Sequence, residues 1–180
     1  MAQFTGFAAN VQVNGQTVLA VVDGMGSFRE TALAILEANG ISDPQPGQWY
    51  SQQEWLDAFQ EIADRVGANT LNLIGRKIPD NADFPADINT LEKALASIDV
   101  AYHLNHRGGD IGEYGFILDR DGQGATMACR NPYPCDFDLG IIQSMCQRFR
   151  GDRVVTIAHD NEQGCRKNGG DTCLYRVTWT

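Results

Sequence analysis

The sequence of 180 residues lacks the long apolar run of a membrane-spanning helix, because no apolar run in it approaches the roughly 20 residues that span a bilayer. It also lacks an N-terminal segment of the secretory type, with a basic start and a long apolar stretch. We therefore expect no membrane span and a cytoplasmic location. The five cysteines should be mostly reduced there, and their odd number fits poorly with a complete set of internal disulfides.

Basic residues are scarce, because 14 lysines and arginines face 23 acidic residues and give a net charge of −9. Phosphate backbones need a basic surface, so we expect no nucleic-acid partner. The chain contains no Gly-x-Ser-x-Gly motif, no P-loop and no dinucleotide-binding fingerprint. No pairing of a nucleophile with a base is evident either, so a non-enzymatic role is favoured.

The length of 180 residues predicts one domain spanning residues 1–180. Asn14-Gly15 is a strong tight-turn signal and predicts a β-hairpin over residues 4–22. The other expected elements are helices at 28–38, 51–66, 68–78, 88–106 and 136–149, a hairpin at 114–130, and strands at 154–159 and 173–179. This order predicts an α+β fold in which helices pack on an antiparallel sheet.

Three of the five cysteines stand at junctions between elements of the last third of the chain. Cys135 opens a predicted helix, while Cys165 and Cys173 lie between the last two strands. Together with Glu162 they offer three thiolates and a carboxylate, which is a candidate tetrahedral zinc set. The alternative ligands are His159, Asp160 and Cys129.

A structural interpretation competes with the metal hypothesis. Free cysteines are often small buried hydrophobes, and the chain has no Cys-x-x-Cys pair. Cys146 lies inside an apolar stripe and is assigned to the core.

The predicted helix 88–106 carries an apolar stripe at helical spacing. His106 follows Tyr102 by four positions and borders this stripe, so it is a candidate to hydrogen-bond a ligand. The alternative is that His106 only interacts favourably with the helix dipole at the C-terminus of the helix. Six residues are candidates to line a ligand cavity, and all are equally suited to the core: Trp55, Phe59, Tyr102, His106, Tyr114 and Phe116.

Residues 131–180 resemble the C-terminal part of the 4-vinyl reductase domain family. In both, a cysteine and a glycine are followed by a helix and a strand, and then by Glu-x-x-Cys, a glycine, and a further cysteine eight positions after that of Glu-x-x-Cys. The corresponding residues here are Cys135, Gly140, Glu162, Cys165, Gly169 and Cys173. The resemblance implies a fold shared with heme–nitric-oxide-binding domains and with the sensor domains of phenol-responsive activators, enclosing an apolar cavity. It also implies a structural zinc on Cys135, Glu162, Cys165 and Cys173. The segment from Cys135 to Glu162 is about four residues longer here than in those sensors.

The resemblance does not extend to heme, because the Tyr-x-Ser-x-Arg motif of the heme-binding branch is absent. The leading hypothesis is a sensory or carrier domain for a small hydrophobic or aromatic molecule, with a structural zinc. It would act as a homodimer or through a separate signalling partner. The alternatives are a tetrapyrrole-related enzyme or accessory protein, and a scaffolding dimer without a ligand.

Overall fold

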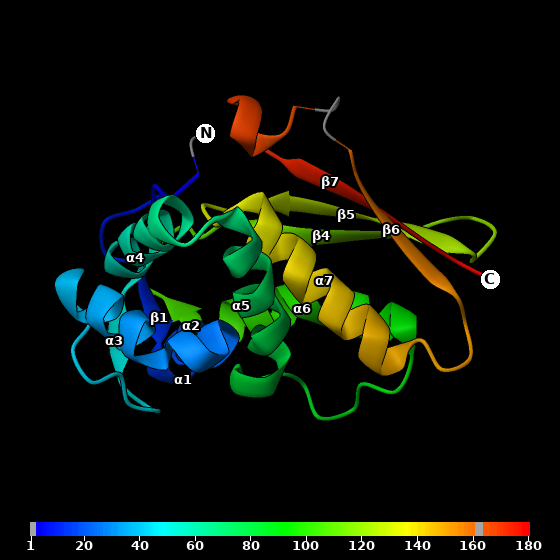
Figure 1. The fold of residues 1–180 in the computed structure, drawn as a ribbon. Helices are drawn as coiled ribbons and strands as arrows, with labels where there is room; N and C mark the ends of the chain where they lie inside the picture. The colour runs from blue at the N-terminus through cyan, green and yellow to red at the C-terminus, as the bar shows by residue number, and fades with distance from the viewer. Residues whose placement is uncertain (1–2, 161–163) are drawn as a thin grey trace.

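The computed structural model describes residues 3–160 and 164–180. The N-terminal half is mainly helical, and all strands of the four-stranded sheet come from the C-terminal half, which also contains two long helices (Figure 1). The helical elements are α1 (Gly15–Val18), α2 (Ala20–Met25), η1 (Gly26–Phe28), α3 (Arg29–Ala38), α4 (Gln52–Arg65), α5 (Ala68–Asn81), α6 (Leu91–Leu104), α7 (Cys135–Phe149) and η2 (Arg166–Asn168).

Two antiparallel sheets are present in the described residues. In the small sheet, β1 (Gln12–Asn14) lies between β2 (Trp49–Ser51) and β3 (His106–Arg107). The larger sheet has the order β4-β5-β7-β6, and its strands are β4 (Glu113–Leu118), β5 (Gly124–Arg130), β6 (Val155–Asp160) and β7 (Cys173–Trp179). The predicted α+β class is therefore confirmed, with helices packed on antiparallel sheet.

The hairpin predicted over residues 4–22 is wrong. Asn14 does not form a tight turn; its side chain accepts a hydrogen bond from the backbone N–H of Gln16 and caps α1. The following apolar residues then form α1 and α2, and β1 pairs with the distant β2 and β3. Asn-Gly suits both a tight turn and a helix N-cap, so only tertiary pairing distinguishes the two.

The other predicted elements are present with shifted boundaries. Helix α6 begins at Leu91, because Thr90 accepts a hydrogen bond from the Lys93 backbone, and it ends at Leu104. His106 consequently lies in β3 and not in the helix. Helix α5 continues past Pro79 to Asn81, into the segment predicted as loop.

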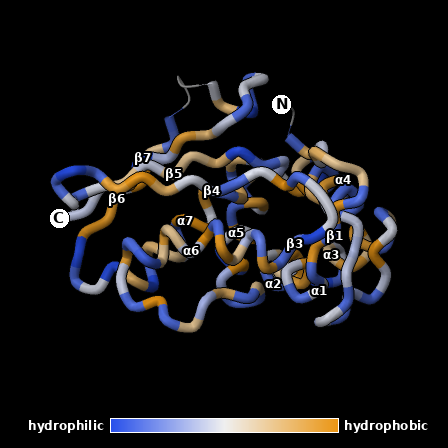
Figure 2. The backbone as a smooth tube through the Cα atoms, turned by 180° about the vertical axis from the view of Figure 1, so that it is seen from behind, coloured by the Kyte–Doolittle hydropathy of each residue, from blue (hydrophilic) through white to orange (hydrophobic). Residues whose placement is uncertain are grey.

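Figure 2 shows apolar stretches along β5 and β6. Alternate residues of β7 are buried, as expected for a sheet with one face on the core. No helix of the described residues is long and apolar enough to cross a membrane.

Helices α5 and α7 cross at a point of very close backbone approach. A Cβ atom on Gly75 would lie 2.1 Å from the carbonyl oxygen of Phe137. On the facing helix, a Cβ atom on Gly140 would lie 2.2 Å from the carbonyl oxygen of Asn72. These separations are far below van der Waals contact, so both positions require glycine to let α7 carry its N-terminus to the sheet.

We expect Gly75→Ala to destabilise the fold by about 1–3 kcal/mol, because forcing extra volume into a packed contact outweighs the gain in helix propensity. Urea unfolding followed by circular dichroism measures the change. Asn69→Ala, on the exposed part of the same helix, is the matched control and should be close to neutral. An unchanged midpoint for Gly75→Ala would contradict the close packing.

Candidate metal centre and buried cavity

Four side chains from four segments converge at one end of the large sheet. Cys135 begins α7, Cys173 begins β7, Cys165 precedes η2, and His159 lies near the end of β6. One ligand atom from each lies within 4.8 Å of all the others. The three Sγ atoms are separated by 3.1 Å (Cys135 to Cys173), 3.4 Å (Cys135 to Cys165) and 3.7 Å (Cys165 to Cys173).

These separations suit a metal ion better than a disulfide. A disulfide bond measures about 2.05 Å, and the cysteines are free. Tetrahedral zinc with Zn–S bonds of about 2.3 Å places its sulfur ligands roughly 3.8 Å apart. A small spreading of the thiols would therefore accommodate the ion, and a cluster of three cysteines and one histidine is a common structural zinc set.

The side chain of His159 is independent evidence for a metal site. Its Nε2 atom is buried and has no hydrogen-bond partner among the described residues. The ring stacks on Tyr175, with centroids 4.5 Å apart and planes at 19°. Leaving a buried nitrogen unpaired costs about 1–3 kcal/mol, a cost that a metal bond would remove.

The structure brings together three of the four ligands predicted from the sequence. Glu162 lies outside the described residues, and the fourth position in the described cluster is occupied by His159, one of the predicted alternatives. Cys129 is paired with Cys173 across β5 and β7, yet its thiol is not part of the cluster. Cys146 is buried on α7, away from the other thiols, as expected for a core residue.

Polar groups around the cluster stabilise negative sulfur. Gln3 Nε2 donates to Cys135 Sγ at 2.7 Å, and Arg166 Nε donates to Cys173 Sγ at 3.3 Å. The hydrogen bond from Cys135 and the nearby Arg166 charge lower the pKa of the Cys173 thiol to about 4. The same Cys135–Cys173 hydrogen bond, together with burial, raises the pKa of Cys135. Of the two thiols, Cys173 therefore loses its proton more readily.

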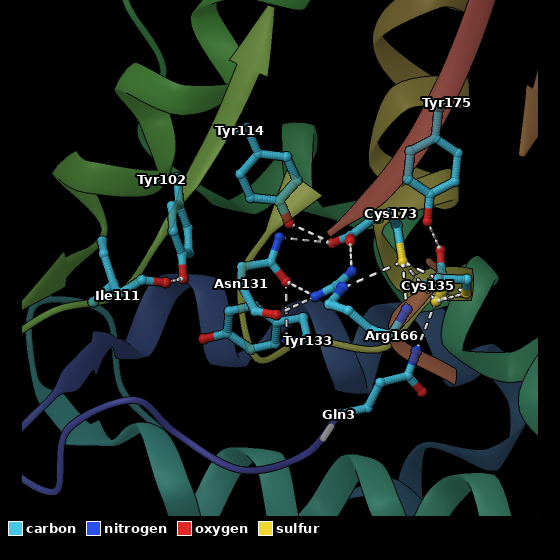
Figure 3. A network of polar contacts seen from close by, with 12 residues as sticks. Gln3, Tyr102, Ile111, Tyr114, Asn131, Tyr133, Cys135, Arg166, Cys173 and Tyr175 are labelled. Carbon is cyan, nitrogen blue, oxygen red and sulfur yellow. Dashed lines mark hydrogen bonds and ion pairs between the residues drawn. The ribbon is translucent and has the colours of Figure 1, made fainter. Parts of the chain in front are cut away.

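Arg166 forms a buried ion pair with Asp138 beside the cluster. Their side chains are 1% and 0% exposed. Arg166 also donates to the carbonyl and side-chain oxygens of Asn131 (Figure 3). Burial raises the pKa of Asp138 to about 6 even though Arg166 opposes this shift. Burial likewise opposes the Arg166 charge, but Asp138 raises the pKa of that guanidinium.

Asp138 also connects the cluster to the interior of the domain. Its carboxylate accepts hydrogen bonds from the Tyr114 hydroxyl and from Asn131 Nδ2. Tyr114 lies on β4 and forms part of the wall of a buried cavity. One chain of polar contacts thus runs from Cys173 through Arg166 and Asp138 to that cavity.

The cavity measures about 30 Å³, space for one or two water molecules. Its wall is mainly apolar and aromatic and consists of Thr17, Trp55, Ile78, Ala82, Phe84, Ile98, Ala101, Tyr102, Asn105, His106, Tyr114, Tyr133, Phe137 and Ile141. Four of the six predicted lining residues stand in this wall: Trp55, Tyr102, His106 and Tyr114. Phe59 packs behind Trp55, with ring centroids 4.8 Å apart, and Phe116 is half-buried on β4. Neither of these two contributes to the wall.

A hydrogen-bonded column fixes the polar side of the cavity. Gln52 Nε2 donates to the Tyr133 hydroxyl at 3.1 Å, and His106 Nε2 lies 2.6 Å from the same hydroxyl. His106 Nδ1 lies 2.8 Å from the carbonyl oxygen of Tyr102. A carbonyl only accepts, so Nδ1 carries the proton and Nε2 accepts from Tyr133. Burial lowers the pKa of His106 to about 4, and the imidazole is neutral at pH 7.

Two atoms near this column lack partners. Trp55 Nε1 and Gln52 Oε1 are buried without a hydrogen-bond partner among the described residues. Trp55 also belongs to the cavity wall.

Several important residues were not predicted from the sequence. Asn131 and Tyr133 lie shortly before Cys135 and Asp138 lies three residues after it, but only Cys135 was predicted as a site residue. The sequence places the cation Arg166 directly after Cys165, but it does not predict that this side chain is buried in an ion pair. Asn105 was overlooked, although it accepts from Thr17 Oγ1 at 3.0 Å and donates to the carbonyl oxygen of Asp83 at 2.9 Å. A polar residue directly before a helix-end histidine was the one available signal.

No protein-family model and no curated protein matches the sequence. Solved structures do match. An H-NOX protein from S. oneidensis in the Fe(II)–NO state has a TM-score of 0.68 and 15% identity, over 93% of this chain and 99% of that one. The fold is that of H-NOX domains.

Two further H-NOX structures support the same fold. An oxygen-binding H-NOX domain related to soluble guanylate cyclases has a TM-score of 0.65 and 16% identity, over 92% of each chain. A point mutant of the T. tengcongensis H-NOX has a TM-score of 0.64 and 13% identity, over 93% of this chain and 97% of that one. The expected kinship with heme–nitric-oxide-binding domains is therefore confirmed at the level of fold. Membership of the 4-vinyl reductase family is not shown.

The buried His106 predicts a pH-dependent stability. The unfolded chain protonates a histidine near pH 6.5, whereas the folded chain protonates His106 only near pH 4. As the pH falls from 6.5 to 4, the unfolded state gains this proton first, so stability present above pH 6.5 is lost by up to about 3 kcal/mol. We expect His106→Gln to remove this loss, as measured by urea unfolding at several pH values.

The pH dependence of stability must be compared between the parent and the variant, because Asp138 increases stability as the pH falls whereas His106 decreases it. Its raised pKa adds stability as the pH falls below about 6, in both proteins alike. His103→Gln, an exposed change near the same helix end, retains His106 and should keep the parent's pH dependence. If the free energy of unfolding changed with pH in the same way in the parent and in His106→Gln, the result would contradict a buried neutral imidazole at His106.

Proposed function

We propose that this chain is a small-molecule-binding sensory domain whose C-terminal hairpin is held in place by zinc. The observation that carries the proposal is the convergence of Cys135, Cys165, Cys173 and His159 within 4.8 Å, in an H-NOX fold. The proposed location is the cytoplasm, and a separate signalling partner would transmit the response.

The zinc would have a structural role. Four protein ligands close the coordination sphere, whereas catalytic zinc keeps one position open for water. Three thiolates, one imidazole and Zn²⁺ carry a net charge of −1, which Arg166 and Lys167 are placed to offset. Arg166 contacts Cys173 directly, and Lys167 pairs with Asp136 in the first turn of α7 at 2.7 Å. The ion would join β6 and β7 to the start of α7.

The ligand would occupy the buried cavity. An aromatic and aliphatic wall favours an apolar body, and the unpartnered Trp55 N–H favours one hydrogen-bond acceptor on it. A ring-sized molecule needs more than the present 30 Å³, so part of the wall must move. The best candidate is Phe84, in the irregular segment 82–90, which is attached to α6 through the Asp83–Asn105 hydrogen bonds.

Heme, which the Fe(II)–NO state of the S. oneidensis protein suggests, does not fit the residues present. The wall of the cavity of about 30 Å³ would have to open much further for a heme than for a single-ring molecule. Both ring nitrogens of His106 are hydrogen-bonded within the protein. No part of the proposal depends on heme, and its absence stays a prediction. The described residues offer no observation that favours tetrapyrrole chemistry or a scaffolding dimer.

We expect one zinc per chain in protein purified without a metal-affinity tag, measured by elemental analysis. Cys165→Ser should lose the metal and lower the free energy of unfolding by about 3 kcal/mol or more, because the ion binds only the folded state. Cys146→Ser changes a buried cysteine outside the cluster and should keep the zinc. Absence of metal in the parent would contradict the site, and a strong visible band in the same sample would contradict the absence of heme.

The same measurement identifies the fourth ligand. If His159 binds zinc, His159→Gln weakens metal binding and Glu162→Gln leaves it unchanged. The opposite result would support the ligand set implied by the family resemblance.

Phenol and toluene test the ligand class, since they have nearly the same shape and only phenol has an oxygen. We expect phenol to raise the melting temperature more than toluene does, through the hydrogen bond from Trp55. That bond should be worth roughly tenfold in affinity. Trp55→Phe should remove the difference while the domain remains folded and zinc-loaded. Equal effects of the two ligands on the parent would contradict the role of Trp55.

A further inference from the structure

A groove lies between α7 and β6, separate from the metal cluster and the cavity. Its volume is about 450 Å³. It is lined by Arg76, Gln143, Cys146, Gln147, Arg150, Val154, Val155 and Ile157. Neither the zinc nor the small-molecule site uses any of these side chains.

One wall of the groove is the free edge of a sheet. In the described part of the chain, β6 is an end strand. Val154 and Thr180 exchange both backbone hydrogen bonds, and such pairs alternate along an antiparallel ladder. The N–H and C=O groups of Val155, Ile157 and His159 therefore point away from β7, toward the open edge.

This edge has none of the devices that usually prevent strand addition. From Val155 to Ala158 it contains no proline and no charged residue, and its pairing with β7 continues without a bulge. The groove-side residues Val155 and Ile157 are only half-buried, whereas their neighbours Val177 and Trp179 on β7 are 0% and 5% exposed. Among the described residues, an apolar strip with unpaired backbone donors and acceptors is thus left open, a surface suited to an additional strand.

Two guanidinium groups give the groove a positive charge. Arg76 is held by neutral acceptors, the side-chain oxygens of Asn72 and Gln143, both at 3.1 Å from Nε. Arg150 donates to the carbonyl oxygen of Arg153 at 3.0 Å. Within the described residues neither arginine forms an ion pair with a carboxylate, although the chain carries a net charge of −9. Both are therefore oriented and still able to bind an anion.

We propose that the groove binds an extended acidic segment of a partner protein, which adds to β6 as a strand. Alternate residues of a strand point to the same side and are about 6.8 Å apart. A segment with the pattern acidic-x-apolar-x-acidic would place its apolar residue on Ile157 and direct its carboxylates toward Arg76 and Arg150. Backbone pairing would supply affinity, and the two arginines would select the acidic sequence.

The first test measures fluorescence anisotropy of a labelled peptide, Ser-Glu-Thr-Val-Thr-Glu-Ser, against the full zinc-loaded chain. We expect saturable binding that weakens with salt, and no binding of the matched peptide in which lysine replaces both glutamates. Arg76→Gln and Arg150→Gln should each weaken binding by up to about fivefold. Arg120→Gln, a change at the tip of the β4–β5 turn, should leave binding unchanged.

The second test addresses the backbone of β6. Ile157→Pro removes one outward N–H but no bond to β7, while Ile157→Ala shortens the same side chain and keeps the N–H. We expect Ile157→Pro to weaken binding well beyond Ile157→Ala. If the proline variant fails to fold, amide hydrogen exchange of the unaltered protein gives the answer. The peptide should then slow exchange at Val155, Ile157 and His159.

Three results would overturn the proposal. One is equal binding, or no binding, of the acidic and basic peptides. Another is protection from exchange that appears elsewhere and spares β6. The third is a concentration-dependent dimer that disappears in Ile157→Pro, because the edge would then be occupied by a second copy of the chain. None of these results bears on the zinc or on the cavity ligand.

Discussion

The buried ion pair between Arg166 and Asp138 is the interaction on which the C-terminal half depends. It joins the turn after Cys165 to the first turns of α7, and Asn131 ties both to the end of β5. Two charges removed from water are tolerable only when every remaining donor and acceptor has a partner. Asn131, Tyr114 and Cys173 provide those partners, and this requirement fixes the relative positions of η2, α7 and the sheet.

This arrangement places the cluster of cysteines and the cavity at two ends of one polar chain. Arg166 contacts Cys173 on one side, and Asp138 contacts Tyr114 in the cavity wall on the other. A change in the charge of the thiolates would alter the field at Asp138, whose pKa burial already raises to about 6. The charge of Cys173 therefore affects the pKa of Asp138 in the interior of the domain, while α5 and α7 are held in close contact at Gly75.

The periodicity of apolar residues was sufficient to predict most elements. Clear apolar patterns at helical or strand spacing are present in helices α4 to α7 and in strands β4 to β7. Periodicity failed at residues 4–22, where Val18 to Val22 suit a buried strand and a buried helix equally. It also failed to separate the candidate wall residues from the core. Trp55 and Phe59 are one helical turn apart and equally buried, yet only Trp55 stands in the cavity wall.

The sequence by itself determined the α+β class and the net negative charge, and it identified Cys135, Cys165 and Cys173 as residues that folding could bring together. These depend on local spacing, composition and the placement of cysteines at element ends. Only the tertiary structure decided that His159 stands beside the thiols, that Arg166 is buried, and that His106 joins a hydrogen-bonded column. Each of these depends on contacts between segments distant in the sequence. A residue's burial and partners are set by such packing, which no local pattern specifies.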